Sequence, residues 1–294
     1  MRVSEIFRFR RLDENVMGIN SRNRDFIYRY NDEVLLSVAA DKITTKRLLS
    51  QQGIPAPETR AVCRSHSELD RFMGQIQGEG KFVIKPNRGS QGNGILLLEQ
   101  IEGDGFRSTS GKLWSRAEVR RHVAEILAGS FSQSGSEDEA YSEPMIAQHE
   151  LLRKISPTGL CDIRLMVRNG YALSAMLRVP TLKSDGKANL HQGAVGASVD
   201  MESGCITRAV LKGAEQPKHP DTEVDLVGVE IPFWKKIVEM AEHCYSAIAL
   251  GYMGVDICID EQLGPLVLEV NGRPGLEIQN VGNRGLGQVV SDAY

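Results

Sequence analysis

Two carboxylates and one amide are predicted to lie side by side near the end of the chain. The segments Gly254–Asp260 and Pro265–Asn271 are rich in apolar residues and a short turn separates them, which predicts a β-hairpin. If a four-residue loop joins the two strands, the antiparallel register places Asp256 opposite Glu269. Asn271 lies two residues after Glu269 and therefore shares its face of the sheet. The other face is expected to be an apolar packing surface made of Val255, Ile257, Ile259, Leu266, Leu268 and Val270.

This pair of facing carboxylates could hold a metal ion. Opposed carboxylates repel each other unless a cation lies between them. Oxygen ligands that include few carboxylates suit Mg²⁺, an ion that also binds nucleotide phosphates. Because a hairpin with a solvated polar face has the same pattern, the segment by itself leaves both interpretations open.

A glycine-rich loop is predicted in the segment Lys81–Leu98, between two short apolar runs that read as strands. Gly89, Gly92 and Gly94 allow left-handed backbone angles and a close approach to a ligand. Successive N–H groups in such a loop form a concavity for anions, above all phosphates, and Lys85 lies just before it. The loop is not a P-loop, because no Gly-Lys-Ser/Thr follows and the next element is a strand. A plain hairpin turn is the alternative.

The elements around these segments alternate between helices and strands. Helices are expected over 45–52 and 67–77, after a capping box at Ser115, and over 231–250. Cys161–Arg168 and Tyr171–Val179 are expected to form a second hairpin around the turn Asn169-Gly170. The stretch 129–143 reads as a mobile loop and 183–195 as an active-site loop.

Together these segments resemble the ATP-grasp superfamily, and within it the RimK-like α-L-glutamate ligases. The resemblance runs from about Asp41 to the last residues. It rests on motifs that occur in the family order: Asp41-Lys42, Gly53-Ile-Pro-Ala-Pro, Val83-Ile-Lys-Pro…Gly-Ser-Gln-Gly-Asn-Gly, Met145-Ile-Ala-Gln-His-Glu-Leu-Leu, Cys161-Asp-Ile-Arg, Asn189-Leu-His-Gln-Gly, Gly254-Val-Asp-Ile and Leu268-Glu-Val-Asn…Pro-Gly-Leu-Glu.

The resemblance implies an α+β fold in which two α/β subdomains with antiparallel sheets clasp ATP. It divides the chain into an arginine-rich segment (1–40), a small subdomain with the glycine-rich loop (41–145) and a large subdomain with the metal site (146–294). Relatives carry a complete α/β domain before the grasp region, and residues 1–40 are too few for one. The arginines of this short segment are interpreted either as binding an acidic partner or substrate, or as part of a solvated arm or a strap on the main body, and the second interpretation is favoured.

The resemblance also assigns roles to individual residues. Phosphate contacts fall on Lys42, Lys85, Gly89, Ser90, Gln91, Gly92 and Gly94. Backbone groups of Gln148, His149, Glu150 and Leu151 would meet adenine, and Asp162 would lie near the ribose or the phosphates. The metal ligands would be Asp256, Glu269 and Asn271, with Glu269 bridging two Mg²⁺ ions that Mn²⁺ could replace.

Four residues are candidates for contacts with the reacting groups: Arg164, Lys187, Asn189 and Arg273. Arg164 could stabilise a carboxylate or a developing oxyanion. Lys187 stands where RimK-like ligases have arginine, which keeps the charge and loses the bidentate fork. Arg273 is expected beside the reacting centre, where it could bind a substrate carboxylate.

The implied reaction joins a carboxylate to an amine. The γ-phosphoryl group of ATP passes to a carboxylate, and an amine then displaces phosphate from the acyl phosphate. The expected product carries an added glutamate or other amino acid on a peptide, protein or small acceptor. A phosphotransferase on the same scaffold and a nucleotide-binding regulatory module without turnover are the alternatives.

Composition fits such an enzyme and excludes other classes. With 294 residues and 41% hydrophobic content the chain can bury one or two cores, and no apolar run has the length of a membrane span. Five cysteines without a CxxC pair, and a start without an apolar signal region, lead us to expect a cytoplasmic protein. The net charge of −3 indicates no nucleic-acid partner, and a homo-oligomer is left open.

Overall fold

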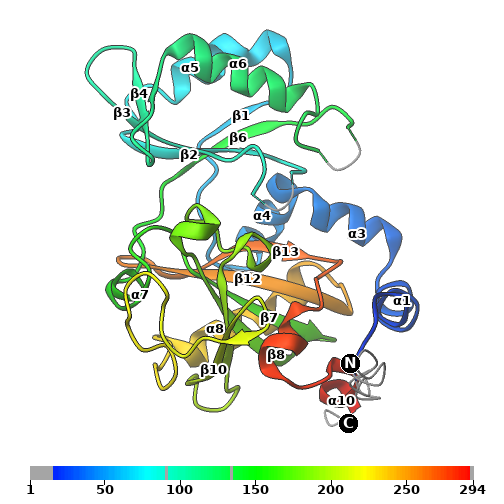
Figure 1. The fold of residues 1–294 in the computed structure, drawn as a ribbon. Coiled ribbons are helices and arrows are strands. Elements are labelled where there is room, and N and C mark those ends of the chain that lie inside the picture. The colour runs from blue at the N-terminus through cyan, green and yellow to red at the C-terminus, as the bar shows by residue number, and fades with distance from the viewer. Residues whose placement is uncertain (1–15, 90–91, 133–134, 292–294) are drawn as a thin grey trace, which may run out of the picture.

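The computed structural model describes residues 16–89, 92–132 and 135–291, which form two bodies, each built on an antiparallel sheet (Figure 1). The smaller body has six strands in the order β1-β6-β2-β3-β4-β5. One face of this sheet packs against α5 and α6, and the core between them contains Phe72, Phe82, Phe106 and Ile126. The elements are β1 (Ala61–Cys63), β2 (Lys81–Pro86), β3 (Leu96–Gln100), β4 (Phe106–Ser108), β5 (Leu113–Trp114), β6 (Ala140–Pro144), η3 (His66–Glu68), α5 (Leu69–Gln75) and α6 (Arg116–Leu127).

The larger body has seven strands in the order β11-β10-β9-β8-β7-β12-β13. The strands are β7 (Asp162–Arg168), β8 (Tyr171–Val179), β9 (Val195–Val199), β10 (Ile206–Leu211), β11 (Ala214–Glu215), β12 (Tyr252–Asp260) and β13 (Gly264–Asn271). The helices of this body are α4 (Lys42–Gln51), α7 (Glu150–Ile155), η4 (Leu182–Ser184), η5 (Leu190–Gln192), α8 (Trp234–Ala247), α9 (Glu277–Gly282) and α10 (Leu286–Ser291). Two antiparallel sheets with their own helices confirm the expected α+β class.

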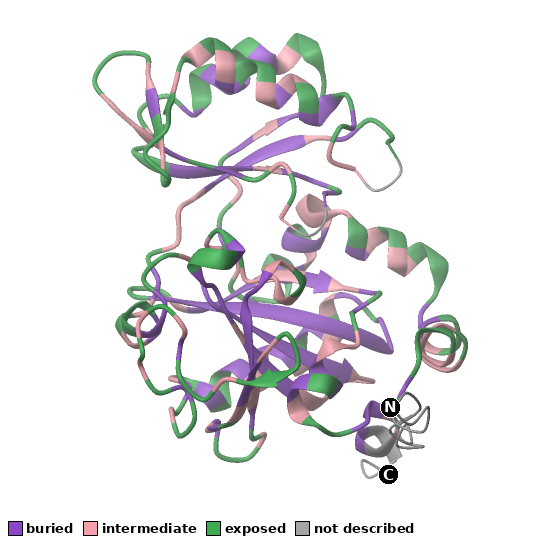
Figure 2. Cartoon of the chain, viewed as in Figure 1, coloured by how far each residue is buried: buried purple, intermediate pink, exposed green. Residues whose placement is uncertain are grey.

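The main core lies between one face of the large sheet and helix α8. Its apolar stripe, which includes Ile237, Ala241 and Cys244, packs on alternate residues of the strands such as Leu165 and Val255. The strands of both sheets are largely buried, whereas the outer surfaces of α5 and α6 are exposed (Figure 2). Because successive residues of a strand face opposite ways, the residues between these core positions form the other face, which carries the candidate site.

Helix α4 joins the large core, although its residues precede the small sheet in the chain. Asp41 caps the helix by accepting a hydrogen bond from the Thr44 N–H (2.8 Å). Leu49 on α4 and Ile54 just after it belong to the large core, whereas the core of the small sheet starts at Ala61. The subdomain limits drawn from the sequence remain predictions, and the packing divides residues 41–145 between both cores.

The described part of the N-terminal segment lies on the large sheet as a strap. It forms α1 (Ile19–Ser21), the π-helix η2 (Arg22–Ile27), α2 (Tyr28–Tyr30) and α3 (Glu33–Ala40). Met17 and Ile27 pack against Met166, Met176 and Tyr252 on the face opposite α8. The strap therefore covers the apolar half of the face whose other half carries the charged residues described below. Arginines 2, 8, 10 and 11 lie outside the described residues.

Asn31 attaches the strap to the sheet. Its side chain donates to the Tyr252 carbonyl (2.7 Å) and the Gly272 carbonyl (3.2 Å), and it accepts from the Tyr252 N–H (2.9 Å). We expect Asn31→Ala to lower the free energy of unfolding by about 1–3 kcal/mol, because it leaves buried backbone groups without partners. Urea unfolding followed by circular dichroism measures this change. Asn20→Ala, at an exposed position of α1, is the matched control, and an equal effect of both changes would contradict the prediction.

Candidate active site

The predicted pairing of Asp256 with Glu269 is present, but the loop that leads to it differs from the prediction. Asp260 pairs with Gly264, which leaves Glu261–Leu263 as the loop, so the expected four-residue loop is wrong. A β-bulge at Leu268 adds one residue to β13 and restores the expected register at Glu269. Between the bulge and the loop the residues of β13 face opposite to the prediction, whereas Ile257 and Ile259 of β12 face the core as predicted. Val267 rather than Leu266 or Leu268 therefore packs in the main core, beside Val270.

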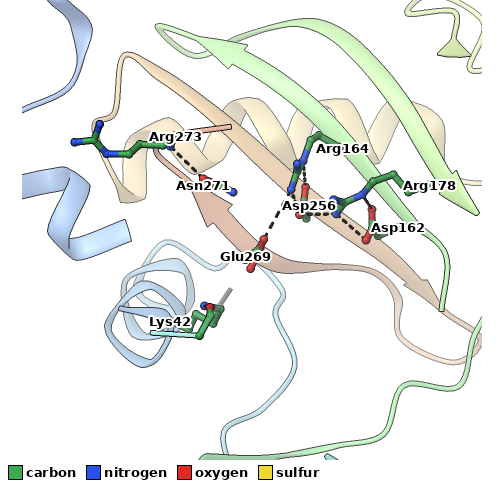
Figure 3. Close-up of polar contacts among 9 residues, drawn as sticks. Lys42, Asp162, Arg164, Arg178, Asp256, Glu269, Asn271 and Arg273 are labelled. Carbon is green, nitrogen blue, oxygen red and sulfur yellow. Dashed lines mark hydrogen bonds and ion pairs between the residues drawn. The ribbon is translucent and has the colours of Figure 1, made fainter. Parts of the chain in front are cut away.

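Asp256 belongs to a continuous network of four largely buried charged residues from three strands (Figure 3). Arg164 on β7 donates from Nε and Nη2 to the two oxygens of Asp256 on β12, at 2.7 and 2.5 Å. Arg178 on β8 donates to both oxygens of Asp162 (2.5 and 2.8 Å) and to Oδ2 of Asp256 (2.7 Å). Glu269 lies at the edge of the network, with Oε1 3.8 Å from Nη2 of Arg164. The arrangement follows from register, since Glu269, Asp256 and Arg164 are direct neighbours across the sheet.

The network shifts the pKa values of its two aspartates in opposite directions. The guanidinium groups of Arg164 and Arg178 outweigh the effect of burial and hold the pKa of Asp256 well below its usual range. Burial, together with the charge of Asp256, raises the pKa of Asp162 to about 6 despite its contact with Arg178. Asp162 and Asp256 raise the pKa of Arg178 against the effect of burial, so this arginine stays charged. Asp256 is therefore the firmly ionised anchor of both arginines.

The donor set fits a divalent cation, with Glu269 as the main ligand. The Glu269 side chain is 35% exposed, and Asn271 lies two residues further on the same face, opposite Gly254. Asp256 already accepts hydrogen bonds from Arg164 and Arg178, and a carboxylate has about four lone-pair positions, so it can still offer one to a metal. Among the described residues no cluster of three His, Cys, Asp or Glu side chains has metal-binding geometry. An ion here would depend on amide oxygen or on ligand oxygens as well.

The glycine-rich loop has the backbone that the sequence predicts at two of its three glycines. Gly92 and Gly94 both have φ of +75°, a conformation that favours glycine. Gly89 lacks a positive φ, but a Cβ there would lie 2.3 Å from Cγ of Pro86, so close packing excludes a side chain. Ser90 and Gln91 lie outside the described residues.

Two predicted phosphate lysines lie at the base of this loop. Lys42 donates from Nζ to the carbonyls of Gly89 (2.7 Å) and Asn87 (3.3 Å). Lys85 places Nζ 2.5 Å from Oε2 of Glu143. Burial lowers the pKa of Lys85 to about 8, and the negative charge of Glu269 on the other sheet opposes this shift. Lys42 on α4 and Lys85 on β2 thus bring two cations to this loop.

The predicted adenine segment connects the two bodies. Asp260 accepts from the Ala147 N–H (3.0 Å), and the His149 N–H donates to the Ile259 carbonyl (2.9 Å). The Gln148 amide is used inside the fold, where it donates to the Ser156 carbonyl and accepts from the Cys161 N–H. Glu150 begins α7, and the Leu151 N–H donates to Nδ1 of His149 (3.3 Å). The side chains of this segment thus fix the path of the backbone.

The three other residues predicted to contact substrate lie outside the charged network. Lys187 is exposed in the loop after η4, and Asn189 caps η5 by accepting from the His191 N–H (3.0 Å). The guanidinium of Arg273 lies over the Tyr28 ring of the strap, 5.4 Å from its centroid. In Figure 3 the Arg273 side chain points away from Glu269 and Asp256. Their roles toward substrate remain predictions.

Sequence reasoning missed Arg178, Glu143 and Lys46. The Asn169-Gly170 turn would pair Arg178 with Cys161 if the hairpin were regular, and Arg178 would then point into the core. A bulge on β8 moves it opposite Asp162 instead. Glu143 fell in a stretch interpreted as a mobile loop, and this is wrong for its end, because Ala140–Pro144 is strand β6.

Comparison with known proteins places the chain and its fold in a known class. The model of the family described as "Sugar-transfer associated ATP-grasp" matches residues 21–292. The fold is similar to that of a biotin carboxylase from Campylobacter jejuni solved as a complex with β,γ-ATP, with a TM-score of 0.56 and 14% identity over 94% of this chain and 52% of that chain. The architecture is therefore the ATP-grasp fold. The chain belongs to the Sugar-transfer associated ATP-grasp family.

Curated relatives extend the comparison to sequences of known name. A "Probable alpha-L-glutamate ligase" of Thioalkalivibrio sulfidiphilus is 25% identical over 85% of this chain. A "Ribosomal protein bS6--L-glutamate ligase" of Escherichia coli is 26% identical over 85% of this chain. The chain spans 61% of the length of each of these two relatives. They support the expected similarity to RimK-like proteins, and ATP use with a divalent metal is general in the ATP-grasp family.

Proposed function

We propose that this protein is an ATP-dependent ligase that joins a carboxylate to an amine through an acyl phosphate. The observation that supports the proposal is that Lys85 lies next to the glycine-rich loop on the small sheet, whereas Asp256 and Glu269 are paired directly on the large sheet. Dense negative charge on a nucleotide requires cations and N–H groups on one side, and a metal held by carboxylates on the other. Both halves of such a site are present on opposite bodies of an ATP-grasp fold.

In this proposal the nucleotide lies between the two sheets. Lys85, Lys42 and the glycine-rich loop from Gly89 to Gly94 contact the phosphates, and the backbone of 148–151 meets adenine. Glu269, Asn271 and the remaining lone pair of Asp256 would hold Mg²⁺, and two ions remain a prediction. The bound metal would neutralise phosphate charge.

The chain's own residues supply charge and orientation. Arg164 and Arg178 are held rigidly by Asp256 and Asp162, so their guanidinium groups are preorganised. A guanidinium in this place can stabilise the negative charge that develops when the acid carboxylate attacks phosphorus. The amine then attacks the acyl carbon, and phosphate leaves as the amide forms. Closure of the glycine-rich loop would exclude water, which otherwise hydrolyses the acyl phosphate.

The identity of the substrates is a further proposal. The relatives named as glutamate ligases support glutamate as the amino acid, with a peptide, protein or small molecule as its acceptor. The family description also makes sugar-linked acids and amines worth including among the acceptors tested. We propose a cytoplasmic location, because all five cysteines are free. In the described residues no helix has the length and apolar character needed to cross a membrane.

The decisive experiment measures release of ADP and phosphate with mixtures of amino acids, peptides and sugar-linked acids, followed by mass spectrometry of the products. We expect equal amounts of ADP and phosphate, and a product heavier than its acceptor by one amino-acid residue. A phosphorylated product with ADP but no free phosphate would assign the protein as a phosphotransferase. Binding of ATP–Mg²⁺ without turnover on any mixture would instead favour a regulatory module.

Arg273 tests the position of the acid. If its guanidinium leaves the Tyr28 ring and binds the substrate carboxylate, Arg273→Ala should raise the KM for the acid about tenfold or more and leave the KM for ATP unchanged. Steady-state kinetics with each substrate varied in turn measures this difference. Arg29→Ala is the control, because its guanidinium also lies over a strap tyrosine, Tyr30, at 5.4 Å. An unchanged KM for the acid in Arg273→Ala would remove this residue from the acid site.

A further inference from the structure

Two lysines from different parts of the molecule share one buried carboxylate, Glu143. Lys85 on β2 lies 2.5 Å from Oε2 of Glu143, and Lys46 on α4 contacts Oε1. The Glu143 side chain is 1% exposed and that of Lys46 is 7% exposed, so water can solvate neither the carboxylate nor the ammonium group. Figure 1 shows α4 between the two sheets. The cluster places two lysine side chains against one buried carboxylate.

The two lysines are held to different degrees. Lys46 also donates to the Pro57 carbonyl (2.9 Å) and lies over the Tyr141 ring, 5.6 Å from its centroid. Lys85 is a diagonal neighbour of Glu143 on one face of the β2–β6 pair, and its side chain is 18% exposed. Lys46 is therefore the fixed partner of Glu143, and Lys85 is the partner able to turn toward the space between the sheets.

The carboxylate is needed to keep both cations in this place. Burial lowers the pKa of both lysines, so each ammonium group depends on the negative charge of Glu143 to stay protonated. The reverse also holds, because a buried carboxylate that loses all its cations is strongly destabilised. If Lys85 left Glu143 to bind a phosphate, Glu143 would need a second cation, and Lys46 is in position to be that cation.

We propose that Glu143 is a positioning residue that holds Lys85 while phosphate is absent, and that Lys46 neutralises Glu143 when Lys85 turns to the phosphates of ATP. This inference rests on the proposed function, in which Lys85 contacts those phosphates. Lys46 thereby lowers the cost of ATP binding without touching the nucleotide. Without Lys46, the buried Glu143 carboxylate has no cation once Lys85 has turned to ATP. The effect of removing Lys46 therefore depends on the presence of the Glu143 carboxylate.

The test is a double-mutant cycle on ATP affinity, measured by isothermal titration calorimetry with ATP and Mg²⁺. We expect Lys46→Met to weaken ATP binding by about tenfold to a hundredfold, because the departure of Lys85 would then leave the buried Glu143 carboxylate without a cation. Adding Glu143→Gln should restore most of the ATP affinity, because no buried carboxylate is then left without a cation. A merely structural role of Lys46 predicts that the double variant binds no better than the single one.

Further comparisons separate the possible outcomes. In the Glu143→Gln background, Lys46→Met should leave ATP affinity unchanged, and this holds as a test even if Lys46→Met alone fails to fold. Lys218→Met removes an exposed lysine paired with Asp225 and is the matched control, for which no change is expected. Failure of the unchanged protein to bind ATP would overturn the proposed function itself. Normal binding in the unchanged protein, loss in Lys85→Met and no change in Lys46→Met would overturn only the inference.

Discussion

Asp256→Asn should lower the free energy of unfolding by about 3–5 kcal/mol, because it removes the anion that pairs with two buried arginines. The only carboxylate left near Arg164 would be Glu269, at 3.8 Å, whereas Arg178 would retain its two hydrogen bonds to Asp162. The amide of asparagine has nearly the shape of the carboxylate, so the change tests charge rather than packing. Urea unfolding followed by circular dichroism gives the free energy. We also expect loss of activity, because both arginines lose their fixed orientation.

The control for this change is Asp225→Asn. Asp225 is an exposed aspartate 3.7 Å from Lys218, and pairs of this kind contribute little to stability. Equal stability of Asp256→Asn and Asp225→Asn would show that the network does not depend on its central charge. Arg164 and Arg178 would then have other counter-ions in solution.

Lys85→Met should lower kcat/KM for ATP by about a hundredfold to a thousandfold, the usual effect of removing one fixed positive group from a site of developing charge. Methionine keeps the length and the apolar part of the side chain and removes the ammonium group. Glu143 would still contact Lys46, so the change should leave the fold intact. Steady-state kinetics with ATP varied measures the effect. Lys81→Met, an exposed position on the same strand, is the control.

The pH dependence of ATP binding gives an independent readout of Lys85. Its pKa is lowered to about 8, so the ammonium form that binds phosphate predominates below that pH and is lost as the pH rises through it. We therefore expect ATP affinity to fall above about pH 8 in the unchanged protein, and this fall to be absent in Lys85→Met. The same fall in both proteins would assign the titration to another group.

The sequence predicted correctly those features that depend on local pattern. Alternation of apolar and polar residues and a short turn are enough to predict the hairpin, and glycine at Gly92 and Gly94 is enough to predict left-handed backbone. The α+β class follows from the same signals. The loop of this hairpin is one residue shorter than predicted, and the pairing of Asp256 with Glu269 agrees with the prediction only because a β-bulge, which a count of residues cannot detect, offsets the difference.

Residues joined only by packing of distant segments could not be predicted. Arg178 reaches Asp162 because a bulge on β8 turns it to the charged face, and Glu143 meets Lys46 because α4 packs under the small sheet. The strap is a further case, since its attachment by Asn31 joins residues 221 and 241 positions apart.

The sequence by itself therefore determined the fold class, the family resemblance, the hairpin that carries Asp256, Glu269 and Asn271, and the lysine before the glycine-rich loop. Only the tertiary structure decided the partners of these residues. Asp256 is hydrogen-bonded to two arginines, and Lys85 forms an ion pair with Glu143, a carboxylate that Lys46 also contacts. The physical reason is that strand periodicity and turn chemistry act over a few residues. The energy of a buried charge depends instead on every segment packed around it, whatever their separation in the chain.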